Sequence, residues 1–68
     1  MLEELVQYYD LYVKEYGSAW VETADFRKLC CHRMNVSEEQ FNAWCMELMD
    51  SGQLRQRLFA GKFYINLK

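Results

Sequence analysis

The side chains whose type could bind a metal ion are three cysteines and a histidine, Cys30, Cys31, His32 and Cys45. Adjacent residues on a helix point about 100° apart, so Cys30 and Cys31 can hardly bind one ion together. Cys45 falls on an apolar stripe, and free cysteine is one of the most buried residue types. The sequence therefore favours core packing of Cys30 and Cys45 over a zinc site and places His32 at the surface. No metal and no other cofactor is predicted.

Motifs for catalysis are missing from the sequence. It contains no Ser/His/Asp set, no phosphate-binding P-loop, no HExxH and no paired carboxylates in an evident cleft. A chain of 68 residues also leaves little room for an enclosed substrate pocket. We therefore expect a protein without enzymatic activity and without a small-molecule substrate.

Charge is distributed unevenly along the chain. Residues 1–52 hold all ten acids and four bases, a net charge of −6, whereas residues 53–68 hold four bases and no acid, a net charge of +4. The four C-terminal bases are Arg55, Arg57, Lys62 and Lys68. A division of this kind indicates an interaction surface with a definite direction.

Composition and length indicate one folded domain over residues 1–68. The chain is 51% hydrophobic and 16% aromatic and contains no proline, which excludes a disordered segment. No apolar run approaches the ~18 residues of a membrane span, and the first residues do not have the pattern of a secretory signal. An odd cysteine count without such a signal indicates a reducing, intracellular setting, either cytoplasmic or nuclear.

Apolar spacing predicts two helices in the first half of the chain. Hydrophobic residues recur at helical intervals over 2–16, and Gly17 follows as a C-terminal cap. A short extended stretch, 18–21, comes next, either as a short strand or as a simple loop with Trp20 packed into the core. The second helix is expected to begin near Thr23 as its N-cap and to end at Asn35, which tolerates the left-handed conformation.

Capping and alternation predict a third helix followed by a hairpin. Ser37-x-x-Gln40 reads as a capping box, and Gly52 ends the helix. Ala60-Gly61 is the predicted turn of the hairpin. In the returning strand the apolar residues Phe63, Ile65 and Leu67 alternate with Tyr64, Asn66 and Lys68, so one face of that strand is apolar.

In this order of elements the chain resembles the winged-helix superfamily over essentially its whole length. The segment MNVSEEQFNAWCMELMDSGQL is similar to the family's third helix and its Leu-x-x-x-Gly-x-Leu ending, and FYINL is similar to the returning strand of the wing. The resemblance implies an α+β fold, a three-helix winged helix-turn-helix with a short strand and a C-terminal two-stranded wing. It indicates no particular functional family. It implies that the exposed face of the third helix enters the major groove of DNA and that basic wing residues contact the backbone.

The first functional hypothesis is therefore binding of double-stranded DNA, as in transcription regulation. Phosphate contacts are predicted from the wing (Arg55, Arg57, Lys62) and the second helix (Arg27, Lys28, Arg33), and limited base readout from Gln40, Asn42 and Ala43. Because the third helix also carries four acids and no base, the wing is expected to lead these contacts. A basic edge hairpin is equally an ordinary device against strand-to-strand aggregation.

The alternative is a protein-interaction module. Exposed apolar residues on an acidic scaffold suit a protein interface, either a homodimer or one part of a larger assembly. The acidic third helix would then face a basic partner. The residues predicted for such an interface are Tyr8, Leu11, Glu39, Met46 and Glu47.

Overall fold

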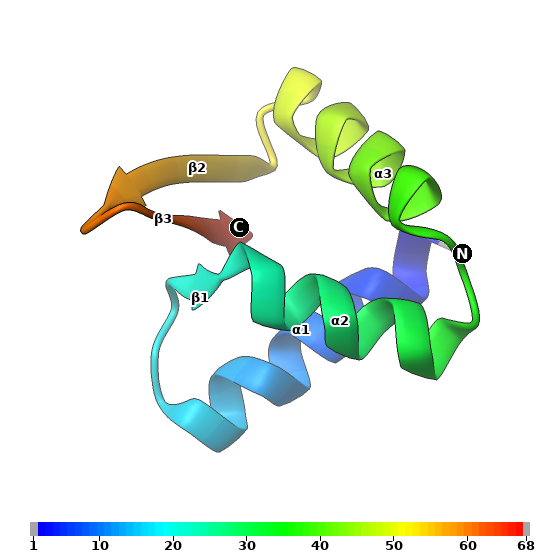
Figure 1. Cartoon of the computed structure of the whole chain (residues 1–68), viewed down its shortest axis with the longest axis horizontal. Helices are drawn as coiled ribbons and strands as arrows, with labels where there is room; N and C mark the ends of the chain where they lie inside the picture. Colours follow the sequence, from blue (N-terminus) through cyan, green and yellow to red (C-terminus); the bar gives the residue numbers. More distant parts are fainter. Residues whose placement is uncertain (1, 68) are drawn as a thin grey trace.

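The computed structural model describes residues 2–67 as three helices and a three-stranded sheet (Figure 1). The elements are α1 (Leu2–Tyr16), β1 (Val21–Glu22), α2 (Thr23–Met34), α3 (Glu38–Asp50), β2 (Leu54–Phe59) and β3 (Lys62–Leu67). The strands are antiparallel in the order β1-β3-β2. This α+β arrangement of three helices, a short strand and a C-terminal hairpin is winged-helix-like, as the sequence predicts.

The core lies between the three helices and one face of the sheet. Phe26 stands at its centre, with edge-to-face ring contacts to Tyr9 at 6.0 Å, Tyr12 at 5.8 Å and Phe41 at 5.9 Å between centroids. Cys30 and Cys45 are buried in this core, which confirms their predicted packing. The buried hydrophobic residues of this core are Leu5, Tyr9, Val21, Phe26, Cys30, Phe41, Cys45, Leu48, Leu54, Ile65 and Leu67.

The first helix has the predicted bounds but not all of the predicted faces. Gly17 ends it in the left-handed region at φ +72°, and its amide donates to the carbonyl of Val13 at 2.7 Å. Tyr16 is the last of the helically spaced hydrophobic residues predicted to face the core. It is exposed instead, on the last turn of α1, and its ring contacts that of Tyr12. Tyr8, expected outside the core, is half-buried against it.

The start of the second helix differs from its prediction. The N-cap is Glu22, with an extended backbone and no capping hydrogen bond from its side chain. Thr23 is already the first helical residue. The reason is tertiary: Glu22 is still paired with Tyr64 in the sheet, so the strand passes directly into the helix. Because of this pairing the N-cap is Glu22, one residue before Thr23, whose hydroxyl side chain is the better capping group.

The turn between the second and third helices follows its local signals. Asn35 adopts the left-handed conformation at φ 55°, and the Ser37 hydroxyl accepts a hydrogen bond from the amide of Gln40 at 3.1 Å. Glu38 and Glu39 occupy the first turn of α3, where the helix dipole favours acids. The predicted capping serine is therefore confirmed.

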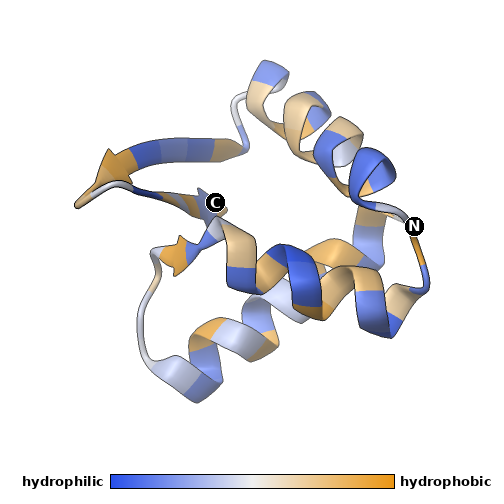
Figure 2. Ribbon diagram, viewed as in Figure 1, coloured by the Kyte–Doolittle hydropathy of each residue, from blue (hydrophilic) through white to orange (hydrophobic). Residues whose placement is uncertain are grey.

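The hairpin turns through two residues, Ala60 and Gly61, both with positive φ, at 52° and 78°. This loop sets the register, which pairs Leu54 with Leu67 at the base and Phe59 with Lys62 at the tip. The strands extend beyond the core, and Figure 2 shows a hydrophobic tip beyond a hydrophilic middle. At this tip Leu58 is 63% exposed, Phe59 64% and Phe63 51%.

Candidate functional site

The six basic residues predicted to contact phosphates lie on three different surfaces. Leu54, the first residue of β2, is buried in the core, so strand alternation places Arg55 and Arg57 on the opposite face of the sheet. A second group lines a groove between α2, α3 and the hairpin, and the last residue lies in a hollow between α1 and α2. The first set is Arg55 and Arg57, the second is Arg27, Lys28 and Lys62, and the third is Arg33. Lys62 only borders the groove, because its cross-strand pairing with Phe59 places it on the same side of the sheet as the first set. Lys68 lies outside the described residues.

The pair on the outer face of the sheet is held by an aromatic ring. The guanidinium carbon of Arg57 lies 5.0 Å from the centroid of the Trp20 ring, and that of Arg55 lies 5.6 Å from it. Both distances are within the range of a cation–π interaction. Trp20 immediately precedes β1 and is half-buried, so its indole supports the two side chains.

Hydrogen bonds hold Arg55 further. Its Nη2 donates to Oδ1 of Asn66 at 2.9 Å, and Nδ2 of Asn66 donates to the carbonyl of Ala19 at 3.1 Å. The hydroxyl of Tyr9 donates to the same carbonyl. Asn66 is buried. These hydrogen bonds therefore link the Arg55 guanidinium through Asn66 of β3 to Ala19, and Ala19 in turn to Tyr9 of α1.

Two more aromatic rings continue this face toward the tip of the hairpin. Tyr64 is the cross-strand partner of Arg57, and its ring meets that of Phe59 edge-on with centroids 6.5 Å apart. We call this surface the cationic face. It consists of Trp20, Arg55, Arg57, Phe59, Tyr64 and Asn66. The strand register places the ion pair of Glu22 and Lys62 at the border of this face, on the same side of the sheet.

The partners of the cations differ in charge between the surfaces. Arg27 lies 4.0 Å from Glu38, and Lys62 lies 3.2 Å from Glu22, a contact that raises the pKa of Lys62. By contrast, neither arginine of the cationic face forms an ion pair with any residue from 2 to 67. Their partners are an indole and an amide. Glu22 lies on the same side of the sheet as the cross-strand partner of Tyr64, but its ion pair is with Lys62, so no carboxylate pairs with either arginine.

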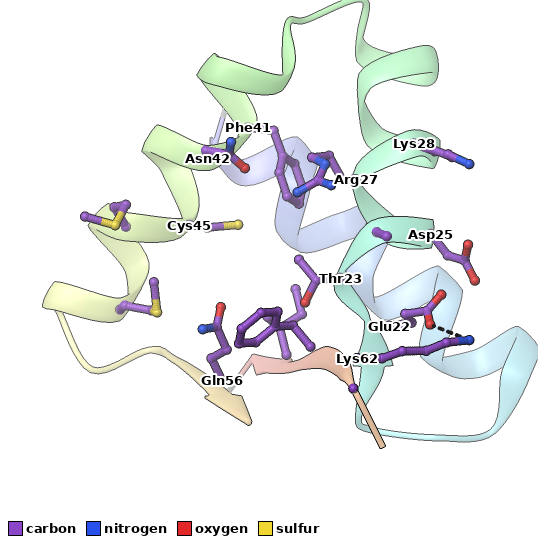
Figure 3. A pocket seen from close by; sticks show the side chains of 16 residues that line it. Glu22, Thr23, Asp25, Arg27, Lys28, Phe41, Asn42, Cys45, Gln56 and Lys62 are labelled. Carbon is purple, nitrogen blue, oxygen red and sulfur yellow. Dashed lines mark ion pairs between the residues drawn. The ribbon is translucent and has the colours of Figure 1, made fainter. Parts of the chain in front are cut away.

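The groove behind the hairpin is a separate site of about 720 Å³ (Figure 3). Cys45 and Asn42 reach it from α3, while Thr23 and Gln56 face them from α2 and β2. Its apolar walls include Met46, which is 58% exposed, and Phe63 at the hairpin tip. The Thr23 hydroxyl is buried without a hydrogen-bond partner in the described part of the chain. Lys28 points away from the centre of the groove.

The residues of α3 predicted to read bases are divided by the groove. Asn42 lines it, whereas Gln40 and Ala43 do not, although all three are exposed. Glu39 and Glu47 are exposed on the same helix. The helix therefore presents an apolar, groove-facing side and a more acidic side rather than a basic reading surface.

The residues predicted for a protein interface are also divided. Tyr8 and Leu11 line the hollow of about 420 Å³ between α1 and α2, together with Leu29 and Arg33. Met46 lines the groove instead. The two apolar surfaces are distinct, so an interface built on one does not include the other's predicted residues.

The thiols are protected by burial. Burial raises the pKa of Cys30 to about 12 and that of Cys45 to about 11, and it also raises the pKa of the half-buried Cys31. Residues 2–67 contain no group of three or more side chains placed to hold a metal ion. No helix in that range is both long and apolar enough to span a membrane.

Sequence reasoning missed four members of the cationic face: Trp20, Phe59, Tyr64 and Asn66. Two of them could have been found, because a two-residue turn at Ala60-Gly61 by itself pairs Arg57 with Tyr64 and Arg55 with Asn66. The place of Trp20 has no such local signal, since it depends on the pairing of β1 with β3 across more than forty residues of chain.

Comparisons with known protein families, curated proteins and solved structures identify no relative of this chain. No family model matches the chain, and no curated protein or solved structure is significantly similar to it.

Proposed function

We propose that this winged-helix-like domain is a non-catalytic nucleic-acid-binding module that holds phosphates with the cationic face of its hairpin. One observation carries the proposal: Arg55 and Arg57 contact neutral partners rather than carboxylates. Such an arrangement orders two guanidiniums in advance and leaves their charge for an external anion. A purely structural pair would be expected to face carboxylates, as Arg27 and Lys62 do.

Arginine suits this role because its planar guanidinium can donate two parallel hydrogen bonds to phosphate oxygens. Each phosphate that a cation neutralises releases counterions, which provides much of the affinity of nucleic-acid binding. Prior ordering of Arg55 by Asn66 reduces the entropy lost on binding.

The third helix supports a leading role for the hairpin. Glu39 and Glu47 are exposed on α3, and carboxylates close to phosphates oppose binding. The apolar Met46 is exposed on the same helix. Contacts by α3 in the major groove therefore have less support than contacts by the cationic face.

Fluorescence anisotropy with labelled DNA, both duplex and single-stranded, tests the proposal. Affinity should fall steeply with salt and should be lost in Arg55→Gln/Arg57→Gln. The matched control is Lys28→Gln/Arg33→Gln, which removes the same charge from exposed positions on α2. Equal losses in the two variants, or no binding of either form of DNA at low salt, would overturn the proposal.

A second candidate function is protein docking in the groove. The observation that favours it is the combination of exposed Met46 and Phe63 with the unpartnered hydroxyl of Thr23. Apolar anchors with a few polar groups are typical of a docking site. The first partner to test is a second copy of the chain. Sedimentation equilibrium should give a dimer that Met46→Glu converts to a monomer, and a monomer at every concentration would exclude this partner.

A further inference from the structure

We infer that the cationic face binds single-stranded nucleic acid in preference to a duplex, with unpaired bases stacking on the aromatic rings beside the arginine pair. This inference rests on the proposed function and goes on to name the ligand class of the same site. It depends on three features of the face: its exposed rings, their position relative to the arginines, and its small charge and width.

The first feature is the exposure of the rings. Phe59 is 64% exposed, and Tyr64 is half-buried beside it. Large exposed aromatic side chains next to cations are the groups on which unpaired bases stack, and Arg guanidiniums stack with bases as well. In a duplex the faces of the bases are already covered by their neighbours, so these rings would have no partner there.

The second feature is the order of groups along the hairpin. Arg55 and Arg57 point to the same side of β2, about 7 Å apart along the strand, and Phe59 follows at the same interval. Tyr64 lies directly across from Arg57 on β3, and Glu22, across from Tyr64 on β1, is paired with Lys62. A single strand that runs along the hairpin would therefore meet phosphate-binding groups first and stacking groups next.

The third feature is the small size of the face. Three strands span only about 10 Å across the sheet, which suits one chain of nucleotides better than a double helix. Two uncompensated cations also provide few phosphate contacts. A duplex would need further contacts from α3, whose exposed Glu39 and Glu47 oppose them. A single strand can add base stacking instead.

The experiment compares a labelled oligothymidylate with the same strand paired to oligoadenylate. We expect the single strand to bind at least tenfold more tightly than the duplex. Its log affinity should fall with log salt concentration with a slope of roughly −1.4, the value for two phosphates on a single strand. Arg55→Gln/Arg57→Gln should remove most of this slope.

A pair of neighbouring substitutions isolates stacking. Phe59→Ser should weaken binding of the single strand about tenfold. Leu58→Ser is the matched control, because Leu58 is 63% exposed on the same strand but points to the opposite face. It should leave binding unchanged. Circular dichroism of each variant confirms that the domain is folded, and the exposure of both side chains makes unfolding unexpected.

The outcomes separate the inference from the proposed function. Duplex binding as tight as single-strand binding would overturn the inference and leave the proposed function standing. Binding of neither would overturn both. Equal effects of Phe59→Ser and Leu58→Ser would show that the loss does not come from the cationic face, and the inference would fail.

Discussion

Arg55 donates a hydrogen bond of 2.9 Å to Asn66, its cross-strand partner, and Asn66 in turn donates to the carbonyl of Ala19 at 3.1 Å. The amide group thus uses its oxygen and its nitrogen at once, and it holds a guanidinium without neutralising it. A carboxylate of the same shape could do only the first. This difference gives the asparagine a role that substitution can test.

Asn66→Asp should weaken nucleic-acid binding although it retains both arginines. The new carboxylate would compensate the charge of Arg55, and it could no longer donate to Ala19, so stability should fall by about 1–2 kcal/mol. Asn66→Ala is the control, because it also loses the hydrogen bond to Ala19 but places no negative charge beside Arg55. Anisotropy and urea denaturation measure the two effects. Wild-type affinity in Asn66→Asp would contradict the role assigned to the cationic face.

Ala60→Asn should stabilise the domain by about 1 kcal/mol. Ala60 lies at φ 52° and Gly61 at φ 78°, so the turn requires two left-handed residues. A left-handed alanine costs roughly 1–2 kcal/mol, whereas Asn-Gly is the preferred pair for such a turn. The urea midpoint measures the change. As a control in the opposite direction, Gly61→Ala should be destabilising by a similar amount.

Thr23→Val should leave stability unchanged or increase it by up to about 1 kcal/mol. The Thr23 hydroxyl is buried without a partner within residues 2–67, so replacing it with a methyl group removes an unfavourable desolvation. Thr23→Ser retains the hydroxyl and should not show the gain. A loss of 1 kcal/mol or more in Thr23→Val, measured by urea denaturation, would show that the hydroxyl is hydrogen-bonded in solution.

Stability should decrease in alkali because of the buried thiols. Their pKa values are raised to about 12 for Cys30 and about 11 for Cys45, above the ~8.5 of an exposed thiol in the unfolded chain. As the pH rises above that value the unfolded chain releases thiol protons first. The stabilisation present below about pH 8.5 is therefore lost progressively toward pH 11 to 12.

Urea denaturation between pH 8 and 11 measures this loss, with a slope of up to about 1.4 kcal/mol per pH unit for each thiol. Cys45→Ala should flatten the slope relative to the wild type, whatever its cost at pH 7. Cys31→Ala should change it less, because Cys31 is only half-buried. Identical slopes in Cys45→Ala and the wild type would mean that the Cys45 thiol is accessible to solvent.

Local signals predicted most of the fold. Gly17, Asn35 and Ser37 end or begin helices where the sequence places them, because each acts through its own backbone or a neighbour three residues away. Thr23 fails as an N-cap for the opposite reason. The pairing of Glu22 with Tyr64 comes from a distant strand, and it outweighs a local preference worth about 1 kcal/mol.

The sequence by itself determined the helices, the turn at Ala60-Gly61, the buried thiols and the excess of bases after residue 52. Only the tertiary structure decided which bases share a surface and which are compensated. Strand alternation places Arg55 and Arg57 on the side of the sheet opposite to the groove. Lys62 forms an ion pair with Glu22, a residue forty positions earlier in the chain. Trp20 reaches the arginines only because β1 pairs with β3. Charge along a chain adds up residue by residue, whereas the field at a surface depends on which side chains folding brings next to each cation.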